Sequence, residues 1–180
     1  MPQYPVIGIA GPARAGKDTV ASYILAARGY GYRYGFADPL KRMLLALNID
    51  CTDPFWVENK ESPIPALGGV SLRHLMQTLG TEWGRQLVHP DLWVTLAKQQ
   101  YADAGPGMVI ADVRFENEAK WIRATGGLVI HIRRTNVQQV KPHASEFGVA
   151  IEPTDVCIGN NGTLEQLHTA VSEMFGGHGS

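Results

Sequence analysis

Short apolar runs alternate with helical hydrophobic periods along most of this chain. Five runs have the length and residue types of buried strands, and they cover residues 5–10, 32–36, 108–111, 128–132 and 155–158. Between and after these runs, apolar residues recur at the three- and four-residue spacing of one helix face. The helical stripes are Val20, Ile24 and Ala27; Leu40, Met43, Leu44 and Leu47; Phe115, Ala119 and Ile122; and Leu164, Leu167 and Val171.

This alternation predicts an α/β fold, because parallel strands need crossover connections and the crossover helices cover both faces of the sheet. Two further helical stripes, in residues 72–79 and 91–100, predict a helical insertion between the second and third strands. Residues 50–70 and 135–153 show no clear period and exceed the roughly 12–15 residues of an ordinary connection. We expect these two segments to be either surface loops or parts that close over a ligand.

Composition narrows the class of protein. The chain has 180 residues, of which 44% are hydrophobic and 18% charged, enough for one folded domain. A formal net charge of −1 argues against nucleic-acid or membrane binding through the overall field. No apolar run approaches the roughly 20 residues of a membrane span and no leader is evident, so the expected compartment is the cytoplasm. The two cysteines fit no metal or redox spacing, and Cys157 is expected in the core.

The segment Gly11–Thr19, with the sequence GPARAGKDT, carries the sharpest chemical signal. It follows a predicted strand and opens a predicted helix, the context in which G-x4-G-K forms a phosphate cradle. Backbone N–H groups and the helix N-terminus then face the phosphates, and Lys17 reaches the β- and γ-phosphates. Asp18 stands where the usual pattern has a Ser or Thr magnesium ligand. We therefore expect Asp18 or Thr19 to hold the ion. The predicted nucleotide-binding residues of this loop are Gly11, Arg14, Ala15, Gly16, Lys17, Asp18 and Thr19.

Polar residues also follow the predicted strands at the edge of the sheet where ligands bind in such folds. Asp112 and Arg114 follow the third strand, and Asp112 either orients magnesium or only caps the next helix. Asp38 follows the second strand and, with Lys41 one helical turn on, either contacts substrate or serves as a helix cap and surface residue. Each pair thus has a functional and a purely structural interpretation.

Two arginine-bearing segments complete the candidate site. Along RHLMQTLGTEWGR, a polar face could hold a phosphate and a base edge, or be merely solvated. Its candidates are Arg73, Gln77, Thr81 and Arg85. Of the nearby Trp83 and Trp93, each is a core or rim residue or one stacks on a base, and Trp93 is the candidate for the site. Arg133 and Arg134 end the fourth strand, where a charge-assisted bond to phosphate is worth about 1.5–3 kcal/mol, against about 0–1 kcal/mol for an exposed ion pair. That difference favours a ligand role for at least one of them.

With these pieces in order, the sequence resembles the phage-type deoxynucleoside monophosphate kinases. The matching pieces are GPARAGKDT, FADPLK, RHLMQTLGTEWGR followed by DLW, IADVRFENEA, GGLVIHIRR, HASE and DVCIGNNGTLEQL, over roughly residues 5–170. The resemblance implies a three-layer P-loop kinase fold with a five-stranded parallel sheet. It also implies a helical nucleotide-binding insertion at about 50–104 and a lid at about 134–153, within one domain.

The resemblance further implies transfer of the γ-phosphate of ATP to a deoxynucleoside monophosphate, with Mg²⁺ as cofactor. Asn160 would then lie beside the adenine, and Asp18, Thr19 and Asp112 are the magnesium candidates. The expected catalytic residues are Lys17, Asp112, Arg114, Arg133 and Arg134. The residues expected to bind the acceptor are Asp38, Lys41, Arg73, Gln77, Thr81, Arg85, Trp93 and Arg114.

Other functions stay open at this stage. Phosphomevalonate kinases share the GKD loop and a D-x-R strand end, and related phage kinases act on modified bases in DNA. A nucleotide-binding switch without transfer activity would keep the loop but need no arginines for an acceptor. The partners expected are small molecules, with a homodimer left open and, for a phage-encoded enzyme, the host cytoplasm as compartment.

Overall fold

A computed structural model describes residues 4–134 and 148–176 of the chain. The chain divides into two compact units, which are described separately. The first comprises Met1–Gly35 and Ala97–Ser180, and the second comprises Phe36–Leu96. The predicted lid at about 134–153 lies mostly outside the described residues, as do His143, Ser145 and Glu146 of the HASE segment.

The first unit is built on a parallel sheet whose strand order is β2-β5-β1-β6-β7. Its strands are β1 (Val6–Ala10), β2 (Tyr32–Tyr34), β5 (Met108–Val113), β6 (Leu128–Arg133) and β7 (Val156–Gly159). All four neighbouring pairs run parallel, so the carboxyl ends of the strands meet at one edge. The five-stranded parallel sheet predicted from the sequence is confirmed.

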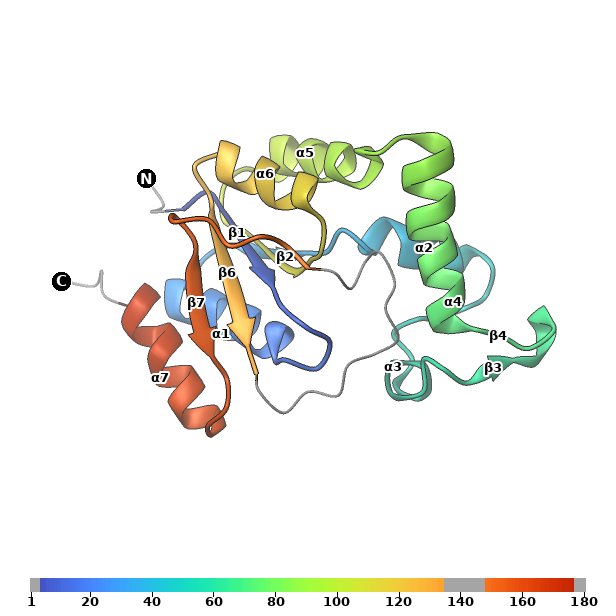
Figure 1. Cartoon of the computed structure of the whole chain (residues 1–180), viewed down its shortest axis with the longest axis horizontal. Coiled ribbons are helices and arrows are strands. Elements are labelled where there is room, and N and C mark those ends of the chain that lie inside the picture. The colour runs from blue at the N-terminus through green and yellow to red at the C-terminus, as the bar shows by residue number, and fades with distance from the viewer. Residues whose placement is uncertain (1–3, 135–147, 177–180) are drawn as a thin grey trace. The chain divides into compact units, whose positions relative to one another are not determined.

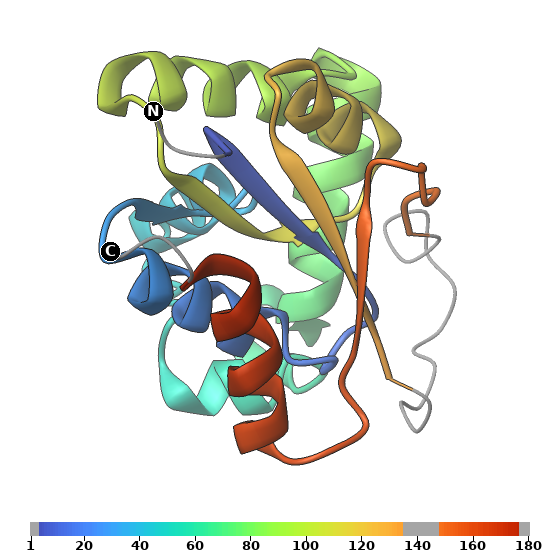
Figure 2. The ribbon, with the colours of Figure 1, turned by 90° about the vertical axis from the view of Figure 1, so that its left-hand side faces the viewer.

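Helices cover both faces of this sheet (Figures 1 and 2). On one face lie α1 (Lys17–Arg28) and α7 (Leu164–Phe175), and on the other lies α6 (Glu116–Ala124). The core under α1 and α7 includes fully buried isoleucines such as Ile9, Ile24 and Ile130, each worth about 1.5–3 kcal/mol in burial. On the α6 face, a Cβ at Gly8 would press into Ile122 and come within 2.9 Å of Val113. A glycine in β1 is therefore required for α6 to approach the sheet.

The second unit contains α2 (Asp38–Ala46), α3 (Pro54–Glu58), a hairpin of β3 (Pro63–Ile64) and β4 (Val70–Ser71), and α4 (Leu72–Gln77). A π-helical segment, Thr78–Val88, continues directly from α4, and α5 (Leu92–Ala104) begins in this unit and ends in the first. Buried Leu44, Ile64 and Leu72 form its core. Because α2 joins this core, the unit begins at residue 36, earlier than the predicted insertion at about 50–104.

Several local predictions are wrong for identifiable reasons. Residues 50–70, expected as loop, contain α3 and the antiparallel hairpin, whose two-residue strands are too short to show a period. In the α2 stripe only Leu40 and Leu44 are buried, while Met43 and Leu47 are exposed. Cys157, expected in the core, is exposed because it lies on β7 at the end of the sheet.

The π-helical segment is locked to α5 through two glycines and Trp93. The indole N–H of Trp93 donates to the Gly80 carbonyl at 2.8 Å, and the side chain is almost fully buried. A Cβ at Gly84 would lie 2.5 Å from Trp93 Cζ2, whereas one at Gly80 would meet only Leu40 Cδ1, at 3.6 Å. Trp93 therefore has a clear packing role, while its predicted stacking on a base stays a prediction.

We expect Gly84→Ala to lower the free energy of unfolding by about 1–3 kcal/mol, since the added methyl group overpacks against the indole. Gly80→Ala is the matched control in the same segment, and its unfolding free energy should be unchanged or up to about 1 kcal/mol higher from helix propensity. Urea denaturation of both variants measures the difference. Equal stability of the two variants would contradict the packing described for Trp93.

Candidate active site

The loop between β1 and α1 has the backbone of a phosphate nest. Gly11, Arg14 and Gly16 have φ angles of 143°, 61° and 92°, so the chain turns repeatedly into conformations that turn N–H groups inward. A Cβ at Gly11 would lie 2.6 Å from the Ile132 carbonyl oxygen, and one at Gly16 would lie 2.5 Å from Asn160 Nδ2. Each position thus requires glycine for two reasons, because its φ angle is positive and because a neighbouring atom leaves no space for a Cβ.

Lys17, the first residue of α1, folds back over this loop. Its Nζ atom donates to the carbonyl oxygens of Gly11 at 2.9 Å and Pro12 at 2.7 Å. The ammonium charge is therefore held at the loop, beside the positive end of the α1 dipole. The phosphate contact expected for Lys17 stays a prediction.

Asn160 ties the segment after β7 to the same loop. Its buried side chain donates from Nδ2 to the Ala15 carbonyl at 2.8 Å, and its backbone N–H donates to the Arg133 carbonyl at 2.8 Å. The carboxamide therefore supports the loop from its own backbone side. The adenine contact expected for Asn160 stays a prediction.

The two residues predicted at the end of β5 lie at the same edge of the sheet. Asp112 is half-buried within β5, and Arg114 follows the strand directly. The backbone N–H groups of Arg114 and Phe115 both donate to Glu118 Oε2, at 2.7 and 3.0 Å. Glu118, only 1% exposed, is thus a side chain that caps α6. The two interpretations of Asp112, as a magnesium ligand and as a helix cap, stay predictions. The sequence analysis overlooked Glu118, although its place three residues after the N-cap is a capping-box signal.

A cavity of about 220 Å³ opens beside the loop, within the first unit. Its lining includes Gly11, Pro12, Lys17, Arg114, His131 and Val149. The cavity is thus lined by the ammonium of Lys17, the guanidinium of Arg114 and the imidazole of His131, beside the backbone of the loop. Such a set of donors suits a polyanion such as a phosphate chain.

The magnesium candidates differ in their surroundings. The Asp18 carboxylate is 86% exposed and forms an ion pair with Arg33. Thr19 and Asp112 are half-buried. Among the residues that the structure describes, no three His, Cys, Asp or Glu side chains cluster in a metal-binding group. Asp18 and Asp112 carry carboxylate oxygens and Thr19 a hydroxyl oxygen, and oxygen is the ligand atom that Mg²⁺ prefers.

Arg133, which ends β6, and Arg134, which follows it, are both exposed. Arg134 donates from Nη1 to the carbonyl of Arg14 in the phosphate loop at 3.3 Å. Arg133 is the last residue of β6, and its carbonyl accepts the Asn160 N–H. The structure thus brings Arg134 against the loop and links the Arg133 backbone to it through Asn160.

The remaining candidates lie in the second unit. Asp38 is the first residue of α2, after the N-cap Ala37, and its Oδ1 accepts from Lys41 Nζ at 3.0 Å. Arg73 pairs with Glu61. Arg85 donates from Nη1 to the Pro90 carbonyl at 3.2 Å. Four candidates recur every fourth residue along α4 and the π-helical segment, namely Arg73, Gln77, Thr81 and Arg85.

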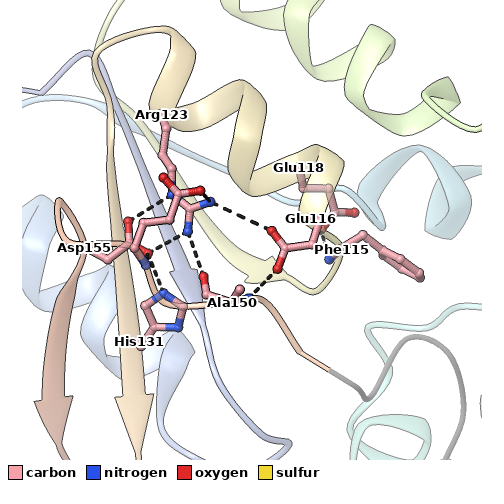
Figure 3. Close-up of polar contacts among 8 residues, drawn as sticks. Phe115, Glu116, Glu118, Arg123, His131, Ala150 and Asp155 are labelled. Carbon is pink, nitrogen blue, oxygen red and sulfur yellow. Dashed lines mark hydrogen bonds and ion pairs between the residues drawn. The ribbon is translucent and has the colours of Figure 1, made fainter.

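A buried polar network at the edge of the cavity was not predicted (Figure 3). Arg123 of α6 donates to Asp155 from Nη2 at 2.6 Å and from Nε at 3.0 Å, and to the Ala150 carbonyl at 2.9 Å. Asp155 also accepts from the Glu152 N–H at 2.9 Å and lies 2.9 Å from His131 Nε2. Glu116 accepts from the Ala150 N–H. The network fastens residues 150–155 to α6 and β6.

The network keeps Asp155 ionised. Burial by itself would raise the pKa of this carboxyl, but the hydrogen bonds from Arg123, the Glu152 amide and His131 outweigh it and lower the pKa from 3.8 to about 2. A carboxyl whose pKa is lower in the folded state stabilises the fold above its unfolded pKa. That stabilisation is lost as the pH falls toward the folded value.

We therefore expect Asp155→Asn to be most destabilising above about pH 4 and progressively less so toward about pH 2. The pKa difference corresponds to about 2 kcal/mol in the free energy of unfolding. Urea denaturation across this pH range measures the difference in the free energy of unfolding between wild type and variant. Asp103→Asn, at an exposed position of α5, is the control. A difference in unfolding free energy that stays constant between about pH 4 and about pH 2 would contradict the role of the ionised carboxylate.

Comparisons with known proteins agree with this geometry. The sequence profile of the deoxynucleotide monophosphate kinase family matches residues 58–171. A protein of Acanthamoeba polyphaga mimivirus, provisionally named a deoxynucleotide monophosphate kinase, is 30% identical over 92% of this chain and 93% of its own length. The deoxynucleotide monophosphate kinase of Escherichia phage RB69 is 35% identical over 58% of this chain, but over only 45% of its own length. The deoxynucleoside-5'-monophosphate kinase of Escherichia phage T5 is 38% identical over 51% of this chain and 40% of its own length.

A solved gluconokinase from Sinorhizobium meliloti 1021 shares the fold, with a TM-score of 0.51 over 97% of this chain and 95% of that one, at 12% identity. This supports the three-layer P-loop kinase fold and says nothing further about the substrate. None of the helices in the described part of the chain is long and apolar enough to cross a membrane. Taken with the phosphate loop and its cavity, the sequence matches show that this chain belongs to the deoxynucleotide monophosphate kinase family.

Proposed function

We propose that the protein transfers the γ-phosphate of ATP to deoxynucleoside monophosphates, giving deoxynucleoside diphosphates and ADP. The observation that carries the proposal is the cavity in which the glycine loop, Lys17 and Arg114 converge. Membership of the deoxynucleotide monophosphate kinase family supports the choice of acceptor. The enzyme would work on free nucleotides in the cytoplasm.

The donor side rests on the phosphate loop. Its N–H groups and the α1 N-terminus bind the β- and γ-phosphate oxygens, and Lys17 neutralises charge that develops during transfer. Asn160 fixes the loop through the Ala15 carbonyl and so limits its movement when nucleotide binds. Arg134, which touches the loop at Arg14, supplies a further cation close to the phosphates.

Magnesium bound with the nucleotide would shield phosphate charge and orient the phosphate chain. Asp112 and Thr19 are the residues we propose to hold it, directly or through water, since both are half-buried near the loop. Asp18 is the weaker candidate, because its exposed carboxylate pairs with Arg33. This chain's part is to position the ion with few of its own ligands.

For the acceptor, we assign a role to Arg114 in the first unit and, separately, to a series of residues in the second unit. Arg114 binds the acceptor phosphate or the transferring phosphoryl group from the cavity wall. We propose that the helical series of the second unit recognises the nucleotide through Arg73, Gln77, Thr81 and Arg85, with Asp38, Lys41 and Trp93 as further contacts. No general base is required, because the acceptor phosphate is already anionic at neutral pH and catalysis depends on positioning and charge neutralisation.

The variants Lys17→Ala and Arg114→Ala test the donor and transfer assignments. Each removes a charge-assisted hydrogen bond to phosphate worth about 1.5–3 kcal/mol, so kcat/KM should fall about ten- to hundredfold. Lys120→Ala, at an exposed position of α6, is the control and should keep the wild-type rate. Wild-type kinetics in both test variants would refute the assignments.

An acceptor panel tests the substrate class. We expect transfer from labelled ATP to at least one deoxynucleoside monophosphate and none to phosphomevalonate or to DNA with modified bases. Including the matching ribonucleotides measures selectivity for the sugar. Transfer to phosphomevalonate or DNA alone would assign a different acceptor, and transfer to nothing, with ATP bound, would favour a nucleotide switch.

A further inference from the structure

His131 lies in the phosphate cavity and has no part in the mechanism above. It sits on β6 opposite Ala10 of β1, the residue before the phosphate loop. It lines the same cavity as Lys17 and Arg114, and only 6% of its surface is exposed. A buried imidazole is rarely placed beside two cations unless its surroundings supply negative charge.

The orientation of the ring is fixed from one side. Nε2 of His131 lies 2.9 Å from Asp155 Oδ2, and the Asp155 carboxyl is ionised at neutral pH because its pKa is about 2. An ionised carboxylate can only accept, so Nε2 carries the hydrogen of this bond. Arg123 holds Asp155 in turn through two hydrogen bonds. The ring can therefore neither rotate freely nor exchange its tautomer without losing the bond to Asp155.

The second ring nitrogen, Nδ1, is not used by Asp155. Figure 3 shows it on the side of the His131 ring away from Asp155. Within residues 4–134 and 148–176, no hydrogen bond from Nδ1 of His131 is found. When both ring nitrogens carry hydrogen, Nδ1 becomes a donor directed away from the carboxylate.

We infer that His131 is a phosphate-binding residue, donating from Nδ1 to a phosphoryl oxygen of the bound nucleotide while Asp155 holds Nε2. The inference rests on the proposed ATP binding in this cavity. Lys17 and Arg114 line the cavity together with the ring, and the Asp155 carboxylate lies on the other side of the ring. Arg123 is compensated by Asp155 and Glu152. A phosphoryl oxygen that enters the cavity would therefore meet donors from three side chains, Lys17, Arg114 and His131.

A different role is also conceivable, in which His131 only anchors Asp155 and never touches the ligand. Two substitutions separate the roles, because Asn places its amide near the position of Nδ1 and Gln places its amide near that of Nε2. His131→Gln keeps a donor for Asp155 and removes the donor toward the cavity. His131→Asn keeps the donor toward the cavity and removes the one to Asp155.

Calorimetric titration with Mg·ATP and with inorganic triphosphate, at about pH 6, decides between them. We expect His131→Gln to keep wild-type thermal stability and to bind both probes about tenfold or more weakly. His131→Asn should be less stable but bind more tightly than the Gln variant. Binding by the Gln variant that equals or exceeds binding by the Asn variant would overturn the inference.

The same titrations separate the inference from the proposed function. Equal affinity of wild type and the Gln variant for both probes would also overturn the inference, while the proposed function would stand. Absence of Mg·ATP binding by wild type would instead refute the proposed function.

Discussion

The junction between β1 and α1 is the constraint on which the rest of the site depends. Gly11 packs so close to the Ile132 carbonyl of β6 that no Cβ would fit, and Gly16 packs in the same way against the Asn160 carboxamide, which follows β7. The loop is thus clamped by two neighbouring segments of the sheet, in a backbone conformation that only glycine adopts cheaply. Its N–H groups are fixed before any ligand arrives, so binding a phosphate chain costs little ordering of the protein.

Around this junction, the buried charges of the first unit are arranged as supports for the cavity. Glu118 caps α6 and holds the backbone of Arg114, which lines the cavity. Asp155 and Arg123 neutralise each other and fix His131, which lines it as well. Paired in this way, the groups avoid the cost of an isolated buried charge. They also give the cavity wall a defined set of donors, which is what transfer by positioning requires.

Much of this could be predicted from the sequence because the signals are local. The five strands, the phosphate loop and the pair Asp112 and Arg114 are each encoded within a few consecutive residues. The network of Arg123, Asp155 and His131 was missed because its members lie 24 and 32 residues apart and meet only through the pairing of β6 with β7. The hairpin of β3 and β4 was not predicted because strands of two residues show no hydrophobic period. The exposure of Cys157 was not predicted because it depends on the order of the strands in the sheet.

The most direct test of the central claim is Mg·ATP affinity, measured by calorimetry, in Gly16→Ala and Gly29→Ala. Both glycines have positive φ at an end of α1, but a Cβ at Gly29 would meet nothing within 4 Å. Both variants should lose about 1 kcal/mol of stability from backbone strain. Gly16→Ala should lose more than Gly29→Ala, because its Cβ would also lie 2.5 Å from Asn160 Nδ2. The account predicts that Gly29→Ala binds as wild type does and that Gly16→Ala loses at least about tenfold in affinity. Equal affinity in the two variants would contradict it.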